Sequence, residues 1–218
     1  MLRHGEPWGE PTSEAPDLEL HGSDADLSAA LANLPPGVRI AWTPSATTDL
    51  GRAVGRAPGT TPPGATLVPM DRLRVNHDRI GVNAVVLGAD PATVRPWHRR
   101  VPVTVTVDGR PFFTGRAMSI VVANGEFVRG IPVLPRAHPG DGALDVAVFA
   151  LPINTRREFR RRIIQGEHLP HPAIRTGRGR TLQVAWVRPR TVVIDGAPAA
   201  PEQQVQIELE SDSWRLYV

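Results

Sequence analysis

The pattern of hydrophobic and polar positions near the start of the chain predicts alternating strands and helices. From Asp17 to Trp42 it indicates a short strand, a glycine-containing turn, a helix and a second strand, an order typical of α/β folds. The helix places Leu27, Leu31 and Leu34 on one face. Ser23 or Asp24 can cap its start, and the run Pro35-Pro36-Gly37 ends it.

A second helix is expected directly after the second strand. Thr47, Thr48 and Asp49 precede a short apolar-periodic stretch and can cap its N-terminus. A loop rich in Pro, Gly and Thr follows over residues 56–67.

Beyond this loop the hydrophobic period becomes two, which is typical of β-strands. Val101, Val103, Val105 and Val107 share one face of a strand that ends in a turn. Further strands are expected over residues 117–123, 144–151, 182–187, 191–194, 205–209 and 214–218. Many short strands favour a sandwich or barrel, so the fold class is α+β.

One helix interrupts the strands, from Thr155 to Gln165. Asn154 or Thr155 can cap it, and Phe159 and Ile163 form its buried side. The other face is expected to carry the arginines Arg156, Arg157, Arg160 and Arg161. This face is either simply solvated or contacts an anionic membrane, where each basic residue contributes about 1 kcal/mol.

The amino-acid composition excludes several kinds of functional site. The chain has no cysteine, which excludes disulfides and thiolate metal sites, and its 25 basic residues are all arginine. A formal charge of only +3 argues against a broad nucleic-acid-binding surface. The chain has neither a secretory signal nor an apolar run of about 18 residues, so we expect a soluble cytoplasmic protein that can contact membranes peripherally.

The segment VVANGEFVRGIPVLPRAHPGDGALDVAVF, residues 121–149, resembles the diacylglycerol kinase family, which includes bacterial lipid kinases and sphingosine kinases. The resemblance depends on Asn124-Gly125, Gly130, Pro135-Arg136-Ala137, Asp141-Gly142 and Leu144-Asp145-Val146. The segments GEHLPHPAI, around His168, and VVIDGAP, around Asp195, add to it downstream, and VNAVVLGADPATV adds to it upstream. It extends from about Asp17 to Val218.

The resemblance implies a partial Rossmann-like α/β lobe that binds ATP and a larger antiparallel β-sandwich lobe that accepts a lipid. Residues 1–16 would be a flexible arm, residues 17–66 the shortened nucleotide-binding-like lobe, and residues 67–218 the β-sandwich domain, whose last strand could return to the α/β lobe. Few strand residues precede the phosphate-loop position, so residues 17–20 would form a sheet edge that a homodimer could cover.

Two nucleotide motifs of this family are altered here. The phosphate loop GGDGT corresponds to Gly22-Ser23-Asp24-Ala25-Asp26, and the motif GTxND corresponds to residues 45–49, so the cofactor-binding candidates are Gly22, Ser23, Asp24, Thr47, Thr48 and Asp49. A carboxylate about 4 Å from a phosphate opposes binding by roughly 4 kcal/mol at an effective dielectric of about 20. Asp26, at the threonine position, would therefore disfavour a triphosphate.

The resemblance also implies a magnesium site and a general base. Asp141 and Asp145, with a backbone carbonyl near Ala143, would bind the magnesium ion, although an ordinary Asp-Gly turn explains them equally well. Asp195 would be the catalytic residue that deprotonates a lipid hydroxyl, or a turn residue only. His168 is better explained as a structural hydrogen-bonding residue.

Two functions from different classes follow. The altered motifs favour a degenerate lipid-kinase-like protein that binds a lipid or amphipathic molecule between its lobes, or pairs with another subunit, and needs no cofactor. The alternative is an active lipid kinase that uses ATP and Mg²⁺. A different small-molecule reaction in the inherited cleft is a third interpretation.

Overall fold

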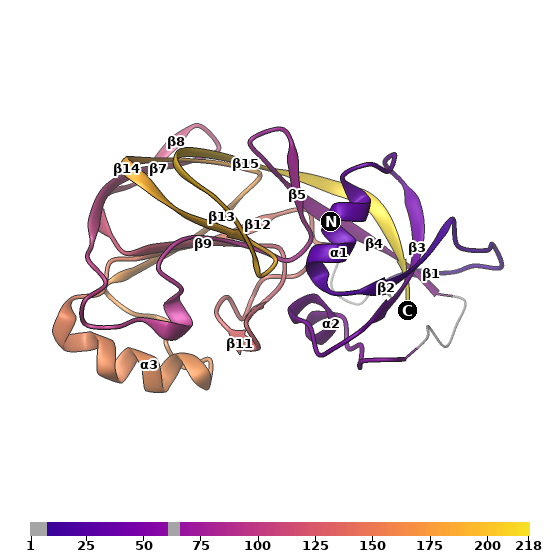
Figure 1. Ribbon diagram of the computed structural model, residues 1–218, viewed down its shortest axis with the longest axis horizontal. Coiled ribbons are helices and arrows are strands. Elements are labelled where there is room, and N and C mark those ends of the chain that lie inside the picture. Colours follow the sequence, from indigo (N-terminus) through magenta and orange to yellow (C-terminus); the bar gives the residue numbers. More distant parts are fainter. Residues whose placement is uncertain (1–7, 61–65) are drawn as a thin grey trace.

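The computed structural model describes residues 8–60 and 66–218 and has two lobes joined by long strands (Figure 1). The elements are β1 (Glu10–Pro11), β2 (Leu18–Gly22), α1 (Asp24–Leu31), β3 (Val38–Pro44), α2 (Asp49–Ala53), β4 (Thr66–Val75), β5 (Arg79–Gly81), β6 (Ala84–Gly88), the 3-10 helix η1 (Pro91–Thr93), β7 (Val101–Val107), β8 (Arg110–Ala117), β9 (Ser119–Ala123), β10 (Phe127–Val128), β11 (Ile131–Pro132), β12 (Leu144–Phe149), η2 (Ile153–Thr155), α3 (Arg156–Ile164), β13 (Ile174–Gly179), β14 (Thr181–Ile194) and β15 (Ala197–Tyr217).

The larger lobe is an antiparallel β structure. Its strands follow the order β15-β14-β6-β9-β12-β13, and β7 and β8 extend from β14. The alternating valines of β7 are buried, as the period of two predicts, and they pack with the inward residues of β12 and β14. A second core beneath α3 contains Phe149, Phe159 and Ile163. The expected α+β fold class is confirmed.

The smaller lobe combines two parallel strands with two short helices. β2 pairs with β3 in parallel, and β3 pairs in parallel with the end of β15 at Trp214–Leu216. Leu27 and Leu31 of α1 are fully buried against Trp42 and Trp214. β4 and β15 also pair with each other over both lobes, so the lobes share two strands (Figure 1).

Several strands are longer than the sequence pattern predicts. The expected strands 182–187 and 191–194 are one strand, β14, and the expected strands 205–209 and 214–218 belong to β15. In both cases the chain crosses an irregularity in the strand pairing, at residues 185–190 and 210–214, and then resumes the ladder. Polar and turn-forming residues at these bulges interrupt the alternation without ending the strand.

The helix of the β lobe differs from its prediction at its start. Thr155 is the N-cap, but its side chain makes no capping hydrogen bond. Arg156, expected on the exposed face, is buried and donates to the carbonyls of Arg95 and Pro96 at 2.9 and 2.8 Å. The prediction for Arg156 was wrong because carbonyls from a distant loop lie beside this position.

The N-terminal segment contacts the body of the protein from Trp8 onward. Residues 1–7 of the expected arm, and residues 61–65 of the expected loop, lie outside the described ranges. β1 pairs with β4, and the hydroxyl of Tyr217 donates to the carbonyl of Glu14 at 2.7 Å. Within residues 8–60 and 66–218, no helix has both the length and the apolar character needed to span a bilayer.

Candidate functional site

A polar cleft of about 300 Å³, which we call the interlobe cleft, lies where the two lobes meet. It brings together five of the six cofactor-binding candidates and the catalytic candidate. Its lining residues are Ser23, Asp24, Thr47, Thr48, Asp49, Arg52, Arg129, Gly130 and Asp195. Gly22, the sixth candidate, directly precedes this set at the end of β2.

The N-terminus of α1 is closed by its own side chains. Asp26 accepts from the backbone N–H and the hydroxyl of Ser23, both at 2.7 Å, and its own N–H donates to the Ser23 hydroxyl at 3.2 Å. These bonds to Ser23 lower the pKa of Asp26. A Cβ added at Gly22 would lie 2.8 Å from the Cβ of Asp26. The predicted Ser23 cap is confirmed, and Gly22 makes room for this capping box.

Asp24 closes the N-terminus of α2 in the same way. Its Oδ2 accepts from the N–H groups of Asp49 and Leu50, both at 3.0 Å, and Thr48 accepts from the N–H of Gly51 at 3.0 Å. Burial raises the pKa of Asp24 to about 7, and the nearby Asp195 adds to the increase. Its Oδ1 is buried and has no hydrogen-bond partner among the described residues.

Asp49 holds the loop between β10 and β11 against α2. Its two carboxylate oxygens accept from the N–H groups of Arg129 and Gly130, both at 2.6 Å. Both loop residues have positive φ, +53° and +75°. The carboxylate therefore fixes a left-handed turn, and this contact draws the two lobes together.

Asp195 sits in a tight connection between β14 and β15. Asp195 and Gly196 both have positive φ, +48° and +81°, as a two-residue type I′ hairpin turn requires. The carboxylate accepts from the Ser28 hydroxyl and from the N–H groups of Val82, Asn83 and Ala84, the latter three at 2.7, 2.9 and 2.8 Å. Burial raises the pKa of Asp195, whereas these hydrogen bonds lower it. Four donors use all the acceptor positions that a carboxylate has.

Two other motif residues, Asn124 and Gly125, contact the segment of residues 82–84 that donates to Asp195. The side-chain amide of Asn124 donates to the carbonyls of Asp71 and Val82 at 2.9 and 3.1 Å. A Cβ at Gly125 would lie 2.3 Å from the Oδ1 of Asn83.

His168 is buried, and its Nε2 lies 2.9 Å from the carbonyl of Val133, which confirms its hydrogen-bonding role.

An arginine lies at the predicted magnesium site. The guanidinium of Arg178 contacts Asp141 through Nη2 and Asp145 through Nε, the latter at 3.2 Å. The N–H of Ala143 donates to Asp141 at 3.1 Å, as in an Asx turn. Burial raises the pKa of Asp145 to about 6 against the opposing effect of Arg178.

This arrangement does not fit a divalent cation. The cationic guanidinium already pairs with both carboxylates, and a magnesium ion prefers an octahedron of oxygens. In the part of the chain that the structure describes, no cluster of three or more His, Cys, Asp or Glu side chains could hold a metal.

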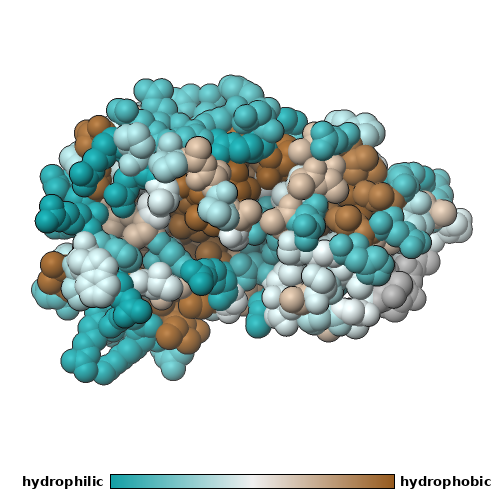
Figure 2. All heavy atoms as spheres, viewed as in Figure 1, coloured by the Kyte–Doolittle hydropathy of each residue, from teal (hydrophilic) through white to brown (hydrophobic). Residues whose placement is uncertain are grey.

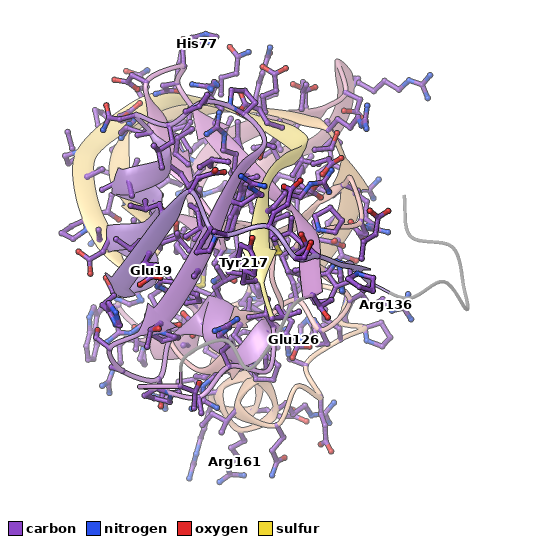
Figure 3. The ribbon with its side chains drawn as sticks, turned by 90° about the vertical axis from the view of Figure 1, so that its right-hand side faces the viewer. Glu19, His77, Glu126, Arg136, Arg161 and Tyr217 are labelled. Carbon is purple, nitrogen blue, oxygen red and sulfur yellow. The ribbon has the colours of Figure 1, made fainter. Side chains whose placement is uncertain are left out.

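A larger cavity of about 760 Å³ lies within the β lobe, away from α1 and α2, and no sequence motif predicts it. It is lined by Leu134, Pro135, Arg136, Asp145, Gly166, Leu169, Pro170, His171, Pro172, Ile174, Thr176, Gly177 and Arg178. Apolar side chains come mainly from the proline-rich segment before β13. Arg136, labelled in Figure 3, provides an exposed guanidinium at this cavity.

A small parallel α/β lobe that shares strands with an antiparallel β-sandwich defines a class of two-lobed, kinase-like proteins. The sequence profile of the YegS C-terminal NAD kinase beta sandwich-like domain matches residues 74–211, more than half of the chain. The chain therefore belongs to this family, and its resemblance to the lipid kinases is confirmed.

Solved structures show the same fold. A diacylglycerol kinase from Bacillus anthracis str. Sterne is similar with a TM-score of 0.71 and 20% identity over 91% of this chain and 76% of that one. Yeast NADH kinase complexed with NADH gives a TM-score of 0.50 and 10% identity, covering 91% of this chain and 60% of that one. At these identities the likeness shows the fold alone. No curated protein matches the sequence.

Proposed function

We propose that this protein is a lipid-kinase-like protein that transfers no phosphoryl group and binds an amphipathic molecule. One observation carries the first part: the groups of the interlobe cleft that a nucleotide would use are bonded to one another. The capping box uses the N–H groups of Ser23 and Asp26 at the start of α1, and Asp24 accepts from the N–H groups of Asp49 and Leu50 at the start of α2. A triphosphate would have to displace the Asp26 carboxylate from the start of α1.

The cavity of the β lobe supports the second part. Its volume of about 760 Å³ falls within the range of about 300–1,000 Å³ typical of small-molecule sites. Leu134, Leu169 and Ile174 offer apolar surface to an acyl chain, and Arg136 offers a charge to its polar head. We therefore place the ligand in this cavity rather than between the lobes, where the cleft is smaller and polar.

Titration calorimetry with ATP and Mg²⁺ tests the loss of phosphoryl transfer. The wild type should bind no nucleotide at micromolar concentrations. The triple variant Ser23→Gly, Ala25→Gly, Asp26→Thr recreates the GGDGT loop and is the matched positive control, because it removes the capping carboxylate. Micromolar binding by the wild type, together with lipid phosphorylation that Asp195→Asn abolishes, would overturn the proposal.

The ligand assignment is tested with a fluorescent short-chain diacylglycerol. Thr176→Trp should weaken its binding at least tenfold, since an indole at this exposed cavity position fills the space that the probe needs. Thr114→Trp is the matched control: the same substitution at an exposed position of β8 that does not line the cavity. Equal binding by both variants would contradict the assignment.

An active kinase is the second candidate, because Asp24 favours it. This residue has a pKa of about 7 and a buried oxygen without a partner among the described residues, as a proton acceptor in the cleft would require. In that case Asp24 or Asp195 would deprotonate the lipid hydroxyl, and ATP with Mg²⁺ would be the phosphoryl donor.

A further inference from the structure

One end of the β lobe exposes large apolar side chains among arginines. Trp97 is 71% exposed, Ile153 66% and Val187 62%. Trp97 and Ile153 line one shallow hollow, and Val187 lines the adjoining one. We call this the end surface, defined as Arg95, Trp97, Arg99, Arg100, Arg116, Ile153, Arg157, Val187 and Arg188.

Buried and backbone-bonded arginines hold the end surface in place. Arg156 binds the carbonyls of Arg95 and Pro96 and also that of Leu151, the last at 3.3 Å. Arg100 donates to the carbonyl of Ala150 at 3.2 Å. The indole of Trp97 is therefore exposed on a fixed loop, with the guanidinium of Arg95 5.9 Å from its ring centre.

The positive charge of this surface is not neutralised by neighbouring acids. Among the described residues, none of its arginines forms an ion pair; the nearby acids Asp90 and Glu158 pair with Arg129 and Arg162, respectively. Helical spacing continues the surface along α3, where Arg157, Arg160 and the 63% exposed Ile164 share a face with Ile153.

Figure 2 shows the same arrangement. Isolated apolar residues lie between hydrophilic ones at the left-hand end in Figure 2, where the β lobe and α3 are drawn.

We propose that the end surface docks on an anionic lipid bilayer, with Trp97 and Ile153 entering the headgroup boundary and the arginines binding lipid phosphates. Tryptophan is enriched at membrane interfaces, and basic residues add attraction to anionic leaflets. A nucleic acid would bind the positive charge, but it would give the exposed Ile153 and Val187 no apolar surface to contact. A protein partner would require a contiguous apolar patch, whereas these apolar side chains are separated by arginines. This inference is independent of the proposed function and goes beyond it.

Vesicle co-sedimentation tests the docking with the full chain. The protein should bind vesicles of equal parts phosphatidylcholine and phosphatidylglycerol but not pure phosphatidylcholine, and high salt should release it. Arg99→Gln with Arg188→Gln should weaken binding at least tenfold, since each basic residue contributes about fivefold. Trp97→Ala should weaken it as well, with an unchanged circular dichroism spectrum, because the side chain is exposed.

The matched control is Arg110→Gln with Arg180→Gln. It removes the same charge at the opposite end of the β7 and β14 strand pair, where Val107 lies beside Leu182. This variant should bind like the wild type. Equal weakening by the two double variants, absence of wild-type binding to the anionic vesicles, or binding to RNA in place of the vesicles would each overturn the proposal. None of these results depends on nucleotide or on occupancy of the β-lobe cavity.

Discussion

Asp24 and Asp195 are two carboxyl groups that share one side of the interlobe cleft. Each binds backbone N–H groups from a distant part of the chain: Asp24 those of Asp49 and Leu50, and Asp195 those of residues 82–84. Burial raises the pKa of both. Asp24 therefore joins the two helices of the smaller lobe, whereas Asp195 connects the two lobes through Ser28, and the protonation of both carboxyl groups affects stability.

Asp24→Asn should flatten the dependence of stability on pH. The unfolded carboxyl ionises near its ordinary pKa of 3.8, whereas the folded one stays protonated up to about 7. The wild type therefore loses stability as pH rises through this window, by the linkage between protons bound and unfolding free energy. Thermal unfolding at about pH 5 and about pH 8 checks this, and the variant should gain on the wild type at the higher pH.

Glu19→Gln provides the control for this measurement, because Glu19 is an exposed carboxylate on β2 and lies outside the cleft. Parallel pH curves for the wild type and Asp24→Asn would show that Asp24 is ionised in the folded protein.

The elements differ in how far local pattern determines them. α1 and β7 were predicted because periodicity and capping residues lie within each segment. β13 was missed, since its sequence IRTGRG contains two glycines and its burial does not alternate regularly. The placement of Arg178 between Asp141 and Asp145 could not be predicted either, because it results from the pairing of β13 with β12. The sequence identified the two carboxylates as a candidate site, but it could not show that Arg178 is their partner.

The turn that precedes β12 should be stable without metal. Neither added Mg²⁺ nor EDTA should move the melting temperature of the wild type, because Arg178 already pairs with both carboxylates. Arg178→Gln should lose about 2 kcal/mol, since the buried Asp145 loses its charge-assisted hydrogen bond. Added Mg²⁺ should then raise the melting temperature of this variant alone.

Arg175→Gln is the matched control for this prediction. It removes an exposed arginine from the same strand, one that forms no ion pair among the described residues. A fall of the wild-type melting temperature in EDTA would show instead that a divalent cation occupies the turn.

The molecule as a whole is held together by strands that belong to both lobes. β15 pairs with β14 in the sandwich through residues 197–208 and with β3 in the α/β lobe through residues 214–216. β4 pairs with residues 207–217 of β15, across the junction of the two lobes (Figure 1). Trp214 is fully buried at one end of this shared ladder, and Leu182, on the neighbouring β14, is fully buried in the sandwich.

The two lobes should consequently unfold in one transition. Trp214→Ala should cost about 3–5 kcal/mol and Leu182→Ala about 2–5 kcal/mol, because each leaves a cavity in a packed core. Since separating either lobe breaks the ladder of β4 and β15, both variants should lower the same single transition, seen alike by near- and far-ultraviolet circular dichroism. Gln204→Ala, at an exposed position of β15, should leave it unchanged. If Trp214→Ala split the melt and left a second transition at the wild-type temperature, the sandwich would be stable alone and the shared strands would not couple the lobes.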